Sequence, residues 1–235
     1  MISIFRKQLA QPKTSWQLCL LAIIGGCASA SLVILFSLSI DAIKAFYQAY
    51  FVNYNSLTFV SRLLLPLCGV FVIILLSKLT GYQYIRAGIP FVLHRLKVSY
   101  GVIPFRNTLN QFVGGVVALA SGFSVGKEGP AVHLGAACAG VIGNQLKLPY
   151  NSIRTLCACG IAAGISACFN TPIAAVIFVM EVILREYKVH IFIPIMLAAI
   201  AGSLMTSYVF GPAHEFEFCV DFSLNNEYYP HLILF

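Results

Sequence analysis

The stretch SGFSVGKEGPAVHLG, residues 121–135, places a lysine and a glutamate in a sequence that is otherwise small and apolar. Lys127 and Glu128 lie between two glycines, and Pro130 follows the second glycine. An ionisable side chain within a membrane segment is costly and is by default a candidate for a functional site. If the chain lies in a membrane, this stretch predicts a functional acid.

Composition indicates that the chain is an integral membrane protein. Hydrophobic residues make up 59% of the 235 residues and charged residues only 10%, and the mean hydropathy is +0.87. A soluble domain carries roughly 25% charged residues. Apolar runs at residues 16–40, 57–79 and 191–210 each approach the roughly 20 residues that a membrane span needs. We therefore expect an all-α, multi-pass protein whose partner is the lipid bilayer.

The positions of the basic residues indicate how the chain is oriented in a membrane. The net charge is +7, and the basic residues lie mostly at segment ends, which is typical of interfacial anchors and topology signals. We therefore expect no nucleic-acid partner. Arg6, Lys7 and Lys13 precede the first apolar run and predict a cytoplasmic N-terminus, and the lack of a large cytoplasmic domain fits a bacterial inner membrane. The expected organisation is a cytoplasmic segment at 1–15, a transmembrane domain at 16–210, and a polar loop with the start of a truncated next helix at 211–235.

Three prolines stand at the start of apolar segments and predict where helices begin. Proline is favoured at the first helical position because its missing N–H would have no intrahelical partner there. Pro90, Pro130 and Pro172 would then open three helices inside hydrophobic sequence, each preceded by irregular backbone. Irregular backbone at membrane depth is tolerated only within protein or along a cavity. Because helix N-termini attract anions, this pattern predicts an anion site.

Glu128 would stand immediately ahead of one of these N-termini. As a carboxylate it would occupy the anion site itself, and after protonation a diffusible anion would replace it, which makes a gate that couples proton binding to anion access. The alternative is that Glu128 caps its own helix or pairs with Lys127. The residues alone leave both interpretations open.

Other chemistry has little support in the sequence. The eight cysteines and five histidines are dispersed, and none has the spacing of a zinc site. No Ser/His or His/carboxylate pattern indicates a catalytic centre. We therefore expect no bound metal, no cofactor and no enzymatic activity.

Three segments together resemble the CLC chloride channels and proton/chloride antiporters: GKEGPAVHLG at 126–135, AGIP at 87–90, and GISACFNTPIAAVIFVMEV at 164–182. The resemblance implies tilted and interrupted transmembrane helices that form the first of two inverted repeats. It also implies a homodimer with a separate anion pathway in each subunit and chloride, or a similar anion, as the transported ligand.

The same resemblance implies site residues. Glu128 would be the gating carboxylate. Many family members carry serine where Ala87 stands, so a side-chain donor to the anion is lost and anion binding or preference would change. The residues expected to bind the anion are Ala87, Gly88, Ile89, Pro90, Gly126, Lys127, Gly129 and Pro130.

A second proton position separates the coupled antiporters from the channels. That position falls at Val182 here, which resembles the channel-type members and predicts an uncoupled or weakly coupled conductor. The neighbouring Glu181 is a possible substitute, although adjacent helix positions point about 100° apart.

The chain supplies only the first of the two repeats that the resemblance implies. The possible missing partner is a C-terminal half. The alternative to an anion channel or transporter is a truncated, non-conducting membrane subunit or a fragment of such a protein.

Overall fold

A computed structural model of the chain describes residues 16–50, 59–80, 88–99 and 101–211. Within these ranges the regular structure is entirely helical, so the predicted all-α class is confirmed. The expected segments at 1–15 and 212–235 lie outside the described residues. The helices are α2 (Trp16–Tyr50), α3 (Phe59–Leu79), α4 (Gly88–Val98), α5 (Phe105–Ala120), α6 (Glu128–Gln145), α7 (Tyr150–Phe169), α8 (Pro172–Phe178) and α9 (Val189–Phe210), with the π-helical segment η2 (Val179–Leu184) continuing α8.

Three of the described helices are long and apolar enough to cross a membrane. They comprise Trp16–Tyr47, Tyr150–Phe169 and Val189–Phe210. The first and third contain apolar runs that the sequence marks as spans. The second is interrupted in sequence by small and polar residues. In its most apolar stretch of 18 residues, 89% is buried inside the protein.

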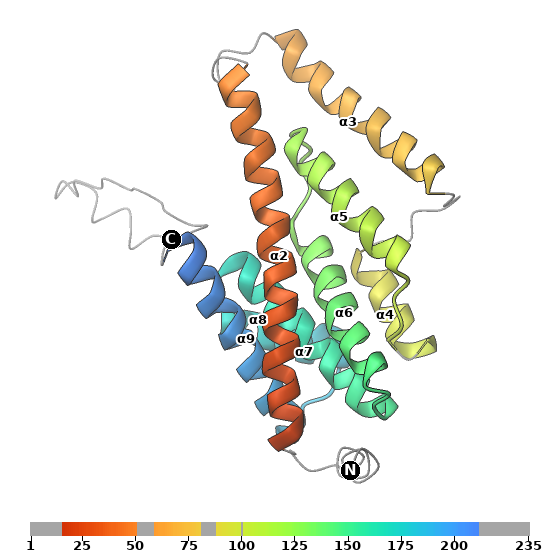
Figure 1. The fold of residues 1–235 in the computed structure, drawn as a ribbon, viewed down its shortest axis with the longest axis vertical. Helices are drawn as coiled ribbons and strands as arrows, with labels where there is room; N and C mark the ends of the chain where they lie inside the picture. The colour runs from red at the N-terminus through yellow and green to blue at the C-terminus, as the bar shows by residue number, and fades with distance from the viewer. Residues whose placement is uncertain (1–15, 51–58, 81–87, 100, 212–235) are drawn as a thin grey trace, which may run out of the picture.

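Helix α7 lies at the centre of the bundle, between α2, α6 and α9 (Figure 1). Every residue from 155 to 168 is buried. These residues are mostly alanine, glycine and cysteine, and small residues allow membrane helices to approach closely. The central helix is therefore apolar on all its faces, with no single stripe that would mark one side as the core.

Glycines set the closest helix contacts. A Cβ on Gly160 of α7 would clash with the carbonyl oxygen of Gly135 in α6, and a Cβ on Gly135 would clash with the carbonyl oxygen of Gly160. The hydroxyl of Ser29 in α2 donates to the Gly135 carbonyl oxygen at 3.1 Å. On the opposite side of α7, a Cβ on Gly202 of α9 would lie 2.5 Å from the Ala163 carbonyl oxygen. These contacts hold the backbone of α7 close to those of α6 and α9, and they attach α2 to α6.

The break between α7 and α8 is built around Asn170. This residue adopts the left-handed conformation, with φ 54° and ψ 35°, which asparagine tolerates better than most residues. Its Oδ1 accepts hydrogen bonds from the hydroxyls of Ser203 at 2.5 Å and Ser207 at 3.4 Å, both in α9. The predicted irregular backbone ahead of Pro172 is confirmed, and Pro172 is the first residue of α8.

The prediction that each of the three prolines occupies the first helical position is wrong for the other two. Pro90 is the third residue of α4 and Pro130 the third residue of α6. Proline is tolerated throughout the first turn, because the N–H groups there have no intrahelical acceptor. The sequence pattern therefore located these two helix starts to within one turn.

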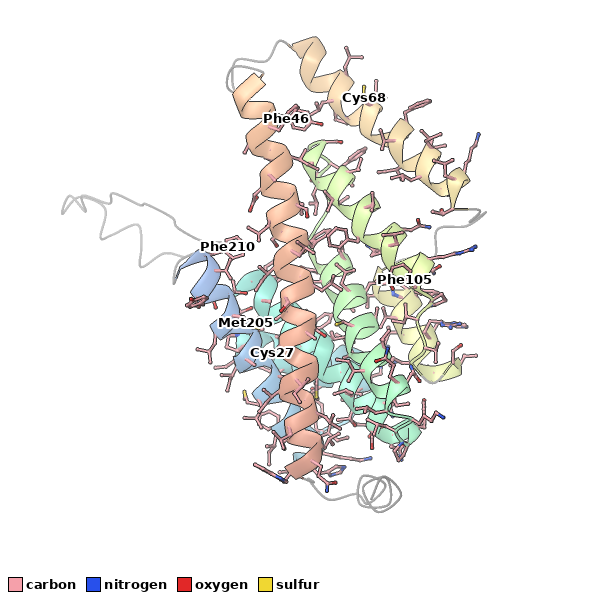
Figure 2. All side chains as sticks on the ribbon, in the orientation of Figure 1. Cys27, Phe46, Cys68, Phe105, Met205 and Phe210 are labelled. Atoms are coloured by element: carbon pink, nitrogen blue, oxygen red, sulfur yellow. The ribbon has the colours of Figure 1, made fainter. Side chains whose placement is uncertain are left out.

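Helix α3 lies at the outside of the described bundle and packs on α5 (Figure 1). Its side chains project outward along much of its length, and Cys68 is exposed (Figure 2). Exposed apolar residues along this helix include Leu67, Phe71 and Ile74. This surface has the composition of a membrane-facing helix.

We predict that Gly160→Ala destabilises the protein by about 1–3 kcal/mol, because the new methyl group would be forced against the backbone of α6. The matched control is Gly114→Ala in α5, where nothing lies within 4 Å of an added Cβ. Removing a helical glycine there should stabilise by about 0.5–1 kcal/mol. Thermal unfolding in detergent, followed by circular dichroism, measures both. A Gly160→Ala protein as stable as the control would contradict the close contact.

Candidate anion site

The first turns of α4 and α6 lie against each other. A Cβ placed on Gly129 in α6 would lie 3.8 Å from the Cα of Gly88 in α4, so the two backbones approach with no side chain between them. Both helices begin in the same part of the molecule (Figure 1). Two sources of helix N-terminal partial positive charge therefore lie side by side.

Helix α4 begins at a residue that only glycine occupies easily. Gly88 has a φ of +75°, a conformation that carries a steric cost for residues with a Cβ. Its N–H donates to the Oε1 of Gln111 in α5 at 3.1 Å. Gln111 was not among the residues that the sequence indicated, although it acts directly on one of them. Ile89 follows Gly88 in the first turn of α4 and is half-buried.

The start of α6 leaves main-chain donors without helical acceptors. Its N-cap is Lys127, which makes no side-chain capping bond, and the Lys127 carbonyl accepts from the N–H of Ala131 at 3.0 Å. The earlier N–H groups of an α-helix have no intrahelical acceptor. Pro130 contributes none, so Glu128 and Gly129 carry the donors of this turn.

Glu128 is the first residue of α6 and is exposed. The expectation that it stands ahead of the helix is therefore wrong, because α6 begins two residues before Pro130 and includes Glu128. A cap by its own side chain and a salt bridge with Lys127 are both absent among the described hydrogen bonds and ion pairs. The carboxylate thus stands at the positive end of α6 without a fixed partner in the described part of the chain.

The third predicted N-terminus lies elsewhere. Helix α8 packs against α7 and α9, and Asn170 just before it contacts Ser203 and Ser207 of α9. Figure 1 shows α8 beside α9, apart from the starts of α4 and α6. Of the three helix starts that the sequence predicted, two therefore meet, and the one at Pro172 lies apart from them.

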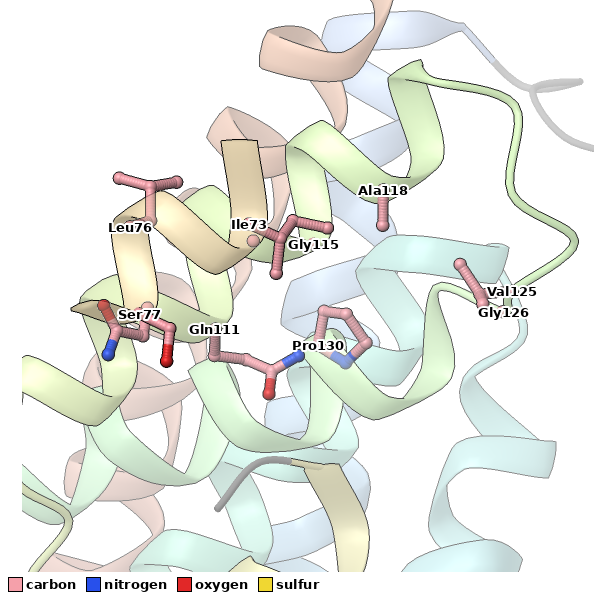
Figure 3. A pocket seen from close by; sticks show the side chains of 11 residues that line it. Ile73, Leu76, Ser77, Gln111, Gly115, Ala118, Val125, Gly126 and Pro130 are labelled. Carbon is pink, nitrogen blue, oxygen red and sulfur yellow. The ribbon is translucent and has the colours of Figure 1, made fainter. Parts of the chain in front are cut away.

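A cavity of about 230 Å³ adjoins the start of α6. It lies between α3, α5 and the segment leading into α6, and Figure 3 shows Gln111 and Pro130 facing each other across it. All of the described residues that line it are uncharged. They are Ile73, Leu76, Ser77, Asn110, Gln111, Gly114, Gly115, Ala118, Val125, Gly126 and Pro130.

An aromatic stack joins the two helices close to their starts. His133 of α6 is fully buried, and its ring stacks on Phe91 of α4 with centroids 5.5 Å apart and planes 11° from parallel. Neither ring nitrogen has a hydrogen-bond partner in the described structure. This contact helps to fix α4 against α6.

One of the sequence-indicated positions, Ala87, lies outside the described residues. Across the ranges that are described, there is no group of three or more His, Cys, Asp or Glu side chains placed to hold a metal ion.

The possible second proton position lies in the π-helical segment η2. Glu181 is exposed, whereas Val182 is half-buried and packs against the main hydrophobic core. The two adjacent residues therefore face different surroundings, as the helical geometry predicts.

An ion-pair group that the sequence did not indicate follows η2. The carboxylate of Glu186 lies 2.8 Å from the Nζ of Lys188 and 3.3 Å from Nη1 of Arg154 in α7. Nη2 of Arg154 also donates to the carbonyl oxygen of Leu184 at 3.0 Å. These contacts tie the end of η2 and the following linker to the start of α7.

Comparison with known families identifies the fold. The model of the voltage gated chloride channel family matches residues 68–235. The chain belongs to this CLC family. A ClcB-like chloride channel protein of Ralstonia nicotianae is 31% identical over 206 residues, which cover 82% of this chain and 47% of that protein. The H(+)/Cl(-) exchange transporter ClcA of Citrobacter koseri is 27% identical over 215 residues, covering 88% of this chain and 44% of that protein.

Solved structures agree with this family assignment. The crystal structure of a CLC-type fluoride/proton antiporter matches with a TM-score of 0.70 and 26% identity, over 94% of this chain and 55% of that one. A slow cyanobacterial Cl-/H+ antiporter shares the fold, with a TM-score of 0.67 and 18% identity over 84% of this chain and 48% of that one. The chain thus spans about half the length of the CLC proteins that it matches.

We predict an acid-dependent loss of stability from Glu186, which lies in the linker between η2 and α9. The hydrogen bond from Lys188 lowers the pKa of the Glu186 carboxyl, and the charge of Arg154 acts in the same direction. The contact therefore stabilises the fold above the unfolded pKa of about 4.3, and this stabilisation is lost as the pH falls below that value. Glu186→Gln should lower stability by about 0–1 kcal/mol at neutral pH and by nothing in acid.

Thermal unfolding of both proteins at several pH values measures this difference. Glu181→Gln is the matched control, because Glu181 is exposed and forms no ion pair within the described structure. A stability difference for Glu186→Gln that persists unchanged in acid would contradict the assignment.

Proposed function

We propose that this protein moves chloride or a similar anion across a membrane, and that the starts of α4 and α6 form part of its anion pathway. The observation that carries the proposal is the meeting of these two helix N-termini at Gly88 and Gly129. Main-chain N–H groups in that position attract anions. The relatives named above are described as chloride channels or exchangers, which does not favour the alternative of a non-conducting subunit.

The anion ligands in this proposal are mainly backbone groups. The N–H groups of Ile89 and Gly129 supply donors from the first turns of α4 and α6, where no intrahelical acceptor is available. Lys127, the N-cap of α6, adds a positive charge at the N-terminus of this helix. The residues proposed to line the pathway are Ala87, Gly88, Ile89, Pro90, Gly126, Lys127, Gly129 and Pro130.

Glu128 is the proposed gate. Its carboxylate is a tethered anion at the N-terminus of α6, where the helix dipole favours negative charge. Protonation removes that attraction, and a diffusible anion then takes the place of the carboxylate. The exposure of Glu128 supports this role, because the side chain has room to move and to exchange a proton.

Whether anion movement is coupled to proton movement depends on the second proton position, which falls at Val182 beside Glu181. Val182 cannot carry a proton, and the exposed Glu181 faces away from the core against which Val182 packs. We infer an uncoupled or weakly coupled conductor.

We propose that residues 16–210 form the first of two inverted repeats and that a second repeat completes the pathway. The functional unit is a homodimer in a bacterial inner membrane, with the N-terminus on the cytoplasmic side.

We predict that Glu128→Gln abolishes the pH dependence of chloride flux. The wild-type flux should rise as the pH falls, because protonation frees the site. The variant should conduct at or above the acidic wild-type level at every pH. Chloride efflux from liposomes that contain the protein, recorded with a chloride-selective electrode, measures both.

The control is Glu186→Gln, which removes a carboxylate outside the proposed pathway and should keep the wild-type pH dependence. A Glu128→Gln protein with the same pH profile as the wild type would exclude Glu128 as the gate. An absence of flux from the 235-residue chain would show that this chain does not conduct by itself.

A further inference from the structure

Basic side chains gather at the end of the bundle where α2 begins. The end of α6 and the start of α9 lie at this same end (Figure 1). The carboxylates nearest in sequence are Glu181 and Glu186, so positive charge is in excess here. We call the basic residues the basic rim, and they lie at the end of α4, between α6 and α7, near the start of α7, and from the end of η2 to the start of α9: Lys97, Lys147, Arg154, Arg185 and Lys188.

Tertiary contacts hold the segments of the basic rim together. The Tyr150 hydroxyl donates to the carbonyl oxygen of Leu96 at 2.7 Å, which joins the start of α7 to the end of α4. Nη2 of Arg154 donates to the carbonyl oxygen of Leu184 at 3.0 Å, which joins α7 to the end of η2. The basic rim is therefore a fixed surface built from segments that are far apart in the sequence.

Three cations of the basic rim are available to a ligand. Lys97, Lys147 and Arg185 are exposed, and their side chains form no ion pair or hydrogen bond with a described residue. The other two cations, Arg154 and Lys188, both contact the carboxylate of Glu186. The charge of these two is thus partly neutralised within the protein, whereas that of the first three is not.

Two of the available cations occupy backbone positions that favour glycine. The φ angles are 48° at Lys147 and 56° at Arg185, a left-handed conformation that carries a steric cost for residues with a Cβ. Glycine commonly ends helices in this conformation. A cation there is also attracted by the negative end of the helix dipole. Substitution by glycine separates the role of the charge from that of the backbone, because it removes the charge without adding strain.

Exposed apolar side chains adjoin the cations. Val98, Leu146, Tyr187 and Val189 are each next to a lysine of the basic rim, and all four are exposed, Tyr187 at 74% and Val189 at 77%. Basic side chains together with tyrosine are typical of the boundary between membrane and water. A site for a soluble ion has no need of such apolar neighbours, so this surface fits a ligand with both a charged and an apolar part.

We propose that the basic rim binds the phosphate groups of anionic phospholipids in the leaflet at this end of the bundle. Lysine and arginine near a membrane surface attract anionic headgroups, and Lys97, Lys147 and Arg185 supply the charge. The apolar neighbours enter the layer between headgroups and acyl chains. This surface is separate from the starts of α4 and α6, so the inference goes beyond the proposed anion pathway and does not depend on it.

The experiment measures lipid binding to the full chain in a non-ionic detergent by native mass spectrometry. The probes are phosphatidylglycerol, which is anionic, and phosphatidylcholine, which is zwitterionic. The wild type should bind phosphatidylglycerol at least about 5-fold more tightly, the effect of about one lysine or arginine near an anionic surface. Glycerol 3-phosphate, which has a phosphate but no acyl chains, should not displace phosphatidylglycerol at an equal concentration.

Lys147→Gly and Arg185→Gly each remove one available cation and fit the left-handed backbone. Each should raise the Kd for phosphatidylglycerol about 5-fold and leave that for phosphatidylcholine unchanged. The control is Lys44→Gln, which removes an exposed cation toward the other end of α2 and should leave both values unchanged.

Glu186→Gln should act in the opposite direction. It releases Lys188 and Arg154 from their ion pairs, so the Kd for phosphatidylglycerol should fall about 5-fold. Circular dichroism shows whether each variant is folded. If one glycine variant is not, the other glycine variant and Glu186→Gln carry the comparison.

Four results would overturn the inference. Equal Kd values for the two lipids would show that the basic rim does not select anionic headgroups. Wild-type affinity in both glycine variants would show that these cations serve the helix ends alone, and unchanged or weaker binding by Glu186→Gln would show that the charge of the basic rim does not set lipid affinity. Displacement of the lipid by glycerol 3-phosphate would assign the surface to a soluble phosphate compound. Each of these results would leave the proposed function intact.

Discussion

Main-chain N–H groups at the starts of α4 and α6 impose the constraint on which this structure depends. Lipid offers no hydrogen-bond acceptor, so irregular backbone and helix ends at membrane depth must be satisfied by protein or by the contents of a cavity. Leaving a buried donor unsatisfied costs about 1–3 kcal/mol. The Gly88 N–H meets the carbonyl of Gln111, whereas the first turn of α6 adjoins a cavity. Of these two arrangements, the one at the start of α6 leaves space for a ligand.

The rest of the bundle supports that arrangement at a distance. The backbone of α6 is held against α7 at Gly135 and Gly160, and Ser29 of α2 donates to the same Gly135 carbonyl. The stack of His133 on Phe91 then fixes α4 against α6. Because these contacts are made by closely packed backbone, by the Ser29 hydroxyl and by the stack of the buried His133 ring on the partly buried Phe91, the two N-termini are placed before any ligand arrives. Such preorganisation lowers the free-energy cost of binding.

The sequence predicted the local features well because they depend on neighbouring residues. Apolar runs and proline positions predicted the helices, and Pro172 marked the break before α8. The sequence did not predict which helix starts would meet, because a proline signal says where a helix begins along the chain and nothing about its position in space. Gln111 lies in an apolar segment and belongs to no motif, and Glu186 pairs with Arg154 from a helix 32 positions earlier in the chain. Both depend on tertiary contacts.

The exposure of Glu128 changes the energetic argument for a gate. The sequence suggested a buried carboxylate, whose desolvation would need strong compensation. The structure instead leaves Glu128 exposed at the N-terminus of α6, where attraction to the helix dipole is typically about 0.3–1 kcal/mol. A side chain held that weakly is displaced by modest competition from an anion or a proton, whereas one held by a buried salt bridge would not be. Weak retention of the carboxylate, together with a fixed set of amide donors, is the combination that a reversible gate requires.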